Sequence, residues 1–231
     1  TETVIGKGLE HYTKDPILTD DGLTWVNGPT EPVNDKIVRP VSDPFQKAGG
    51  LKQLKGNLGR GVMKVSAVAP ERQIIEAKAR IVHDQADVKA AFQAGEFTED
   101  TVVVVRFQGP SAVGMPELHS LTPVLAVLQD RGLRVALVTD GRMSGASGKV
   151  PAAIHVCPEA ANGGPLARLH DGDLVRVDAV SGEIDVLEPD FDTREPATCD
   201  QSANHHGLGR EMFQVFRQNV GHAADGASAI L

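Results

Sequence analysis

A strand–helix–strand pattern in the middle of the chain constrains the fold more than any other feature. Residues 102–107 begin with four consecutive valines, which predict a buried strand, and residues 134–138 form a second apolar strand. Between them a helix is expected to end at Gly132, because leucines recur at helical spacing: Leu118, Leu121, Leu125 and Leu128. This order forms a βαβ unit, whose strands are parallel and whose crossover is right-handed in nearly all cases.

Further elements are expected on both sides of this unit. Residue patterns predict strands over 62–68, 77–82, 152–156, 174–178 and 184–187, and helices over 87–95 and 210–220. We expect the last helix to turn three apolar side chains inward, namely Met212, Val215 and Phe216. Strands in both orientations, together with crossover helices, predict an α/β fold with a mixed sheet or a closed β-barrel flanked by helices.

Residues 1–50 differ in composition from the rest of the chain. Five prolines interrupt every candidate helix or strand there, and Gly, Asp and Thr are frequent. We therefore expect an extended arm or linker over residues 1–50 and a globular domain over residues 51–231.

Composition excludes several classes of protein. The 231 residues carry a formal net charge of −8, which argues against nucleic acid as a partner because phosphate contacts need a basic surface. No apolar run approaches the roughly 18 residues of a membrane span, and the first residues lack a signal pattern. Two cysteines in a chain of this length are compatible with the reducing cytoplasm, where we expect the protein to reside.

Two polar loops follow the two strands of the βαβ unit. The first covers residues 109–117, and the second, residues 140–149, combines three glycines and two serines with Asp140, Arg142 and Lys149. Both loops leave the carboxyl ends of parallel strands, the edge at which open α/β sheets bind their ligands. Arg142, Ser147 and Lys149, with the loop amides, are candidates for an anion site, although loop cations are often only solvated.

The two loops resemble the carboxy-terminal part of the dihydroxyacid/phosphogluconate dehydratase family. The resemblance rests on Gly-Met-Pro-Glu at 114–117 and Asp-Gly-Arg-Met-Ser-Gly-Ala-Ser-Gly-Lys at 140–149, and residues 144–156 are most similar to the 6-phosphogluconate dehydratase branch. It implies a barrel of the swivelling-domain type over residues 51–231. It also implies that residues 1–50 lead from an amino-terminal domain that this sequence does not contain.

The resemblance implies roles for particular side chains. Ser144 corresponds to the base that removes the proton beside the substrate carboxylate, and Glu117 to a ligand of a divalent cation, usually Mg²⁺. Without the resemblance, Ser144 could simply hydrogen-bond its own loop, and Glu117 could stabilise the start of a helix. Asn57, in Gly-Asn-Leu-Gly, either hydrogen-bonds the substrate or caps its own turn. Arg142, Ser147 and Lys149 would bind a phosphorylated sugar acid.

The resemblance further implies a hydro-lyase of the Entner–Doudoroff pathway that converts 6-phospho-D-gluconate to 2-dehydro-3-deoxy-6-phosphogluconate and water. Its [4Fe–4S] ligands would lie in the amino-terminal domain, Mg²⁺ would be shared, and the full enzyme would be a homodimer. This chain alone would then be inactive, since Cys157 and Cys199 do not form a cluster motif. Two alternatives remain: a dehydratase of an unphosphorylated dihydroxy or aldonic acid, and a noncatalytic anion-binding module.

Three histidines invite a ligand interpretation that their contexts do not favour. His155 lies on a predicted strand, where a core or sheet-face role is the more common one. His205 and His206 lie in a polar segment, where we expect structural or solvated side chains.

Overall fold

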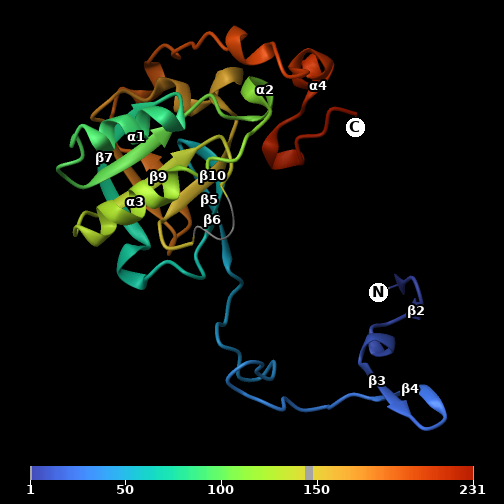
Figure 1. Ribbon diagram of the computed structural model, residues 1–231. Helices are drawn as coiled ribbons and strands as arrows, with labels where there is room; N and C mark the ends of the chain where they lie inside the picture. Colours follow the sequence, from blue (N-terminus) through green and yellow to red (C-terminus); the bar gives the residue numbers. More distant parts are fainter. Residues whose placement is uncertain (1, 144–147, 231) are drawn as a thin grey trace. The chain divides into compact units, whose positions relative to one another are not determined.

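The computed structural model describes residues 2–143 and 148–230, and the chain divides into two compact units, Thr1–Ala48 and Gly49–Leu231. The first unit contains two small sheets, of which the longer is the hairpin of β3 (Lys14–Thr19) and β4 (Gly22–Asn27) (Figure 1). The rest is a two-residue pairing of β1 (Glu2–Thr3) with β2 (Gly6–Lys7) and a 3₁₀ turn, η1 (Glu10–Tyr12). Every described side chain up to residue 48 is at least partly exposed.

The hairpin corrects the expectation that prolines interrupt every element before residue 50. Pro16 lies inside β3, opposite Trp25. Proline lacks a backbone N–H, but each strand of a two-stranded hairpin has an unpaired edge where no donor is needed. The expectation that prolines prevent any strand before residue 50 is therefore wrong for residues 14–27.

The second unit contains a closed barrel of eight strands in the order β10-β6-β5-β12-β11-β7-β8-β9. The strands are β5 (Leu51–Gly56), β6 (Gly59–Lys64), β7 (Ile74–Val82), β8 (Thr101–Val105), β9 (Val135–Thr139), β10 (Ala152–Cys157), β11 (Leu174–Asp178) and β12 (Glu183–Val186). Strands β7 to β10 run parallel, as do β5 and β12, while the remaining neighbours are antiparallel. The predicted α/β fold with a mixed barrel is confirmed.

Four α-helices accompany the barrel in the described residues. They are α1 (Gln85–Gln93), α2 (Pro110–Val113), α3 (Leu121–Asp130) and α4 (Gln214–Asn219). Short 3₁₀ turns complete the unit: η2 (Pro70–Arg72), η4 (Ala160–Asn162), η5 (Pro165–Arg168), η6 (Phe191–Thr193), η7 (Ser202–His205), η8 (Arg210–Phe213) and η9 (Ala223–Asp225). None of the helices in this part of the chain has the length and apolar character that a bilayer crossing requires.

The valine run of β8 is explained by burial on both faces. Val102 and Val104 point into the barrel core, whereas Val103 and Val105 pack with the leucines of α3 in a second apolar cluster. Helices α1 and α3 cover this outer face of β7 to β9 (Figure 1). Because each strand of the βαβ unit is covered twice, its sequence is continuously apolar instead of alternating.

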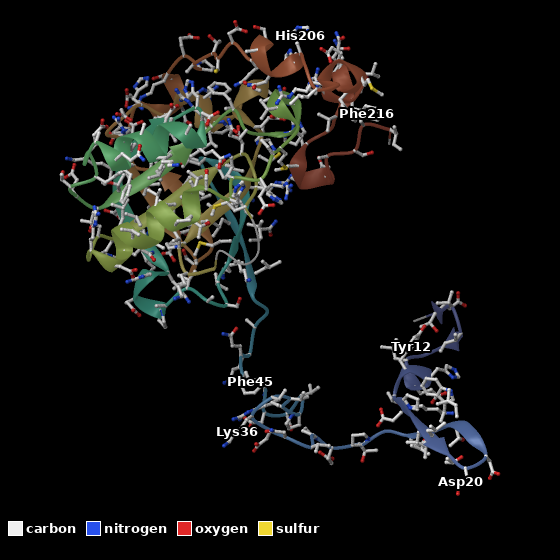
Figure 2. The ribbon with its side chains drawn as sticks, in the orientation of Figure 1. Tyr12, Asp20, Lys36, Phe45, His206 and Phe216 are labelled. Carbon is white, nitrogen blue, oxygen red and sulfur yellow. The ribbon has the colours of Figure 1, made fainter. Side chains whose placement is uncertain are left out.

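Two expected elements differ in the structure. The strand expected over 62–68 ends at Lys64, because the chain turns where the N–H of Val68 donates to the carbonyl of Val65 at 3.1 Å. The terminal helix is a 3₁₀ turn followed by the short α4, and its apolar side chains do not point inward. Met212, Val215 and Phe216 are 78%, 66% and 51% exposed, and Figure 2 shows Phe216 at the surface. Helical spacing of apolar residues predicts an apolar helix face, but it does not predict which surface of the protein that face packs against.

Candidate functional site

The two polar loops meet at one edge of the barrel. The N–H of Leu118 donates to the carbonyl of Arg142 at 3.0 Å, and Nε of Arg142 donates to the carbonyl of Met115, also at 3.0 Å. Glu117 and Arg142 form an isolated parallel bridge between the loops. The prediction that parallel β8 and β9 deliver both loops to the same edge is confirmed.

An ion pair joins the loops through their side chains. Nη1 of Arg142 lies 3.6 Å from Oε2 of Glu117, and the two side chains are 47% and 35% exposed. A ligand can therefore reach a carboxylate and a guanidinium that lie side by side. A divalent cation bound by Glu117 would have to share the carboxylate with Arg142.

Each loop has one glycine at which a neighbouring residue leaves no space for a side chain. A Cβ on Gly141 would lie 2.8 Å from Cβ of Gln108 and 3.1 Å from Cδ1 of Leu118. A Cβ on Gly109 would lie 2.1 Å from Oε2 of Glu159. Neither position has room for a side chain, so the backbone itself forms the contact surface.

The described residues at the two ends of the second loop lie at opposite ends of β10. The N–H of His155, near the end of β10, donates to the carbonyl of Gly141, while Ala152 at its start pairs with Leu137. Gly148, the residue before Lys149, lies against Ala67. Ala67 follows the end of β6, and this end of β6 pairs with the start of β10. The structure thus joins Arg142 to Glu117 but sets Lys149 at the other end of the strand. Ser144 and Ser147 lie outside the described residues.

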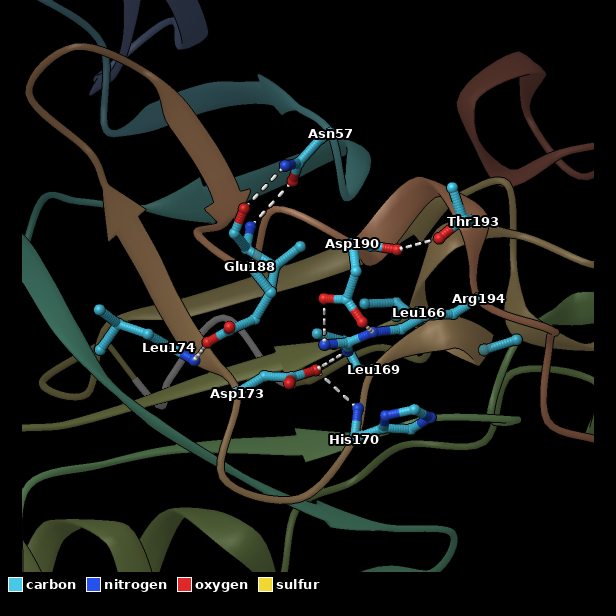
Figure 3. A network of polar contacts seen from close by, with 12 residues as sticks. Asn57, Leu166, Leu169, His170, Asp173, Leu174, Glu188, Asp190, Thr193 and Arg194 are labelled. Atoms are coloured by element: carbon cyan, nitrogen blue, oxygen red, sulfur yellow. Dashed lines mark hydrogen bonds and ion pairs between the residues drawn. The ribbon is translucent and has the colours of Figure 1, made fainter.

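Asn57 is engaged with the barrel backbone. Its Nδ2 donates to the carbonyl of Val186 at 2.8 Å, and its Oδ1 accepts from the N–H of Val186 at 2.8 Å (Figure 3). Its own N–H donates to Oδ1 of Asp185 at 2.7 Å. Both ends of the amide therefore bridge the β5–β6 turn to β12, a contact that neither of the two sequence interpretations contained. Its role in substrate binding stays a prediction.

Three buried charged residues follow directly after the strands of this edge, and sequence reasoning gave none of them a role. They are Arg106 after β8, Asp140 after β9, and Glu159 two residues after β10, with exposed fractions of 7%, 0% and 4%. The signal in the sequence was a charged residue shortly after a mostly apolar strand.

Asp140 accepts three backbone hydrogen bonds. Its Oδ1 accepts from Gln108 at 2.9 Å, and its Oδ2 accepts from Phe107 at 3.1 Å and from Ala160 at 2.9 Å. Burial raises the pKa of Asp140 to about 6, against the opposing effect of these N–H donors. The carboxylate thus ties the ends of β8 and β9 to the segment after β10.

Glu159 and Arg106 extend this arrangement to the neighbouring loops. Glu159 accepts from the N–H of Ser111 at 2.8 Å and from that of Ala112 at 3.2 Å, which satisfies the first donors of α2. Nη1 of Arg106 donates to the carbonyls of Leu166, Ala167 and Leu169. Burial lowers the pKa of Arg106, and the neighbouring Asp140 opposes that shift.

The histidines occupy different surroundings. His155 has a backbone φ of 56° and a partly buried side chain. Burial, and secondly Arg142, lower the pKa of His155. His205 ends η7 and is partly buried, whereas the next residue, His206, is exposed.

The described residues do not complete a metal or cluster site. Within residues 2–143 and 148–230 no group of three or more His, Cys, Asp or Glu side chains could hold a metal ion. Cys157 is buried and Cys199 partly buried, and both are free thiols. Glu117 would supply a single oxygen ligand for Mg²⁺, which requires several. A [4Fe–4S] cluster likewise lacks its set of cysteines here.

Comparison with known proteins identifies the family of the chain. The family "Dihydroxy-acid/6-phosphogluconate dehydratase C-terminal" matches residues 36–227. The chain is 60% identical over 230 residues to a phosphogluconate dehydratase of Pseudomonas aeruginosa, covering 98% of this chain and 37% of that protein. It is 50% identical over 230 residues to a phosphogluconate dehydratase of Escherichia coli K12 (99% and 38%), and 41% identical over 169 residues to a dihydroxy-acid dehydratase of Halothermothrix orenii (70% and 30%).

These relatives are much longer than the chain, which spans less than two fifths of their length. The match nevertheless extends over nearly the whole chain and includes both polar loops. The chain therefore belongs to the dihydroxy-acid/6-phosphogluconate dehydratase family and is its C-terminal domain.

Proposed function

We propose that the complete protein is a phosphogluconate dehydratase that converts 6-phospho-D-gluconate to 2-dehydro-3-deoxy-6-phosphogluconate and water in the Entner–Doudoroff pathway. The observation that carries this proposal is the identity of 60% and 50%, over nearly the whole chain, to relatives named for that activity. The joined loops support it, because they hold an accessible carboxylate and a guanidinium at one edge of the barrel.

The proposed reaction assigns one step to this chain. Ser144, acting as its alkoxide, would take the proton from C2 as the C3–O bond breaks. The departing hydroxide would take up a proton and leave as water, and Ser144 would then return its own proton to the solvent. The resulting enol then tautomerises to the 2-oxo acid. Arg142 would hold one anionic group of the substrate beside Glu117, and Asn57, Ser147 and Lys149 would bind other parts of the substrate, Lys149 from the opposite end of β10.

The proposal includes partners that the described residues do not supply. The [4Fe–4S] ligands and the remaining Mg²⁺ ligands would come from the amino-terminal part of the polypeptide, and the complete enzyme would be a cytoplasmic homodimer. An apolar groove of about 700 Å³ supports the docking of that part. It lies between the α2 loop and the C-terminal segment, and its lining includes Val113, Pro116, Phe213, Phe216 and Ile230.

Ser144→Ala and Lys149→Ala in the complete enzyme test the assigned roles. Loss of the base should lower kcat by about 10² or more with little change in KM, whereas loss of a substrate contact should raise KM more than it lowers kcat. Exchange of the C2 proton with solvent deuterium is an independent measurement. Exchange at the parental rate in Ser144→Ala would assign the base to another residue.

Substrate choice tests the proposed activity itself. We expect dehydration of 6-phosphogluconate at low KM and much weaker dehydration of gluconate by the complete enzyme. Equal kcat/KM for the two acids would favour the dehydratase of unphosphorylated acids. The 231-residue chain alone should show neither iron–sulfur absorbance nor turnover, and turnover by it would contradict the division of the site between two domains.

A further inference from the structure

Two buried carboxylates beside the loops that carry Glu117 and Arg142 accept hydrogen bonds mainly from backbone N–H groups, and the side chain of Asn162 is a further donor to Glu159. We propose that Asp140 and Glu159 are positioning residues, which fix these two loops against each other and thereby set the Glu117–Arg142 pair. The catalytic consequence rests on the proposed function, whereas the mechanical role does not.

The contacts of Asp140 fix where each loop begins. Phe107 has a left-handed φ of 63°, which ends β8 sharply, and its N–H and that of Gln108 both point to the Asp140 carboxylate. Asp140 itself is followed by Gly141, which packs against Gln108. One buried side chain therefore determines the separation of the two loops at their first residues.

Glu159 fixes the first loop one turn further along. It lies against Gly109, accepts from the N–H groups of Ser111 and Ala112, and lies within 3.4 Å of Nδ2 of Asn162, which also donates to Oγ of Ser111. Helix α2 ends only four residues before Glu117. A shift of α2 would therefore move the carboxylate of Glu117 away from Arg142.

Carboxylates suit this task because they only accept hydrogen bonds. An ionised carboxylate offers two oxygens to several N–H donors at once, and bonds to a charged acceptor are stronger than neutral ones. An amide of the same shape turns one acceptor into a donor. Asp140→Asn must therefore face Nδ2 toward either Gln108 or the pair of Phe107 and Ala160.

Hydrogen–deuterium exchange of the 231-residue chain tests the mechanical role without any assay of activity. Asp140→Asn should accelerate exchange roughly tenfold or more at Phe107, Gln108 and Ala160, and Glu159→Gln should do so at Ser111 and Ala112. Asp130→Asn, at the exposed end of α3, is the matched control and should change neither region. Unchanged loop exchange in both variants would overturn the proposal. If Asp140→Asn fails to fold, Glu159→Gln alone decides it.

The complete enzyme tests the catalytic consequence. Glu159→Gln should lower kcat for 6-phosphogluconate at least tenfold, while Val177→Ala, a core change in β11 chosen to lower Tm by a similar amount, should leave kcat within about twofold. Equal losses in both variants would assign Glu159 a merely structural role and overturn the positioning of the site. Faster loop exchange in an enzyme that does not dehydrate 6-phosphogluconate would instead contradict the proposed function alone.

Discussion

Two polar networks of the barrel use the same kind of side chain in opposite ways. At the loop edge, Asp140 bonds to three N–H groups and burial raises its pKa to about 6. Beside β11, Asp190 and Asp173 bond to the guanidinium of Arg194, and the hydrogen bond from Arg194 holds the pKa of Asp190 below its ordinary value (Figure 3).

The two networks differ in the segments of the chain that they hold in place. Arg194 ties the segment after β12 to the start of β11, where Asp173 also accepts from the N–H of His170 at 2.7 Å. That network holds the segment after β12 against the residues before β11. The Asp140 network instead holds loops that carry candidate site residues. Damage to the first should lower stability, and damage to the second should change the site.

Breaking the Arg194 network should give the largest loss of stability. Arg194→Met leaves the nearly buried carboxylate of Asp173 without its cation, and we expect Tm of the 231-residue chain to fall by roughly 5–10 °C. Arg80→Met is the matched control, because its partners Glu96 and Asp171 are about half exposed, and its Tm should change by less than about 2 °C. Equal shifts in the two variants would remove the distinction between buried and exposed pairs.

Titration of Asp140 should be visible in the pH dependence of stability. Its pKa is about 6 in the folded state against an ordinary 3.8, so the folded chain binds the proton more tightly. The associated stabilisation is full below about pH 4 and is lost as pH rises through 6, a change of about 3 kcal/mol. The charged groups beside it are Glu159 and Arg106.

Urea unfolding of the wild type and of Asp140→Asn between pH 4 and pH 7 measures this effect. The free energy of unfolding of the wild type should decline relative to that of the variant as pH rises. A constant difference across this range would show that Asp140 titrates as it does in the unfolded chain.

Substitution of Asn57 should give the smallest loss of stability among these variants, and it separates a role in the barrel from a role in substrate binding. Asn57→Ala removes two hydrogen bonds to Val186, and we expect a loss of about 1–2 kcal/mol in the free energy of unfolding. If Asn57 also binds substrate, KM of the complete enzyme will rise as well, and a stability loss with unchanged KM would leave only the role in the barrel. Asn219→Ala, in the exposed α4, is the control for loss of an asparagine.

The sequence predicted the centre of the fold better than its ends. The strand Val102–Val105 could be predicted because burial on both faces produces an unbroken apolar run. The leucines of α3 could be predicted because they recur at helical spacing. Pro16 and Phe216 were misread for a common reason: a residue pattern gives a preference, while the neighbouring surface decides the outcome. Pro16 lies in a two-stranded hairpin, which has free edges, and Phe216 is half exposed.

The sequence by itself determined that the loops carrying Glu117 and Arg142 meet, because parallel strands joined by one crossover end at the same edge of a sheet. Only the tertiary structure decided how they are held, since the partners of Asp140 and Glu159 are backbone groups of loops up to 48 residues away along the chain. It also decided that Lys149 is not beside Arg142. The chain after β9 must turn back to reach the start of the parallel strand β10, so Arg142 and Lys149 lie apart although they are close in sequence.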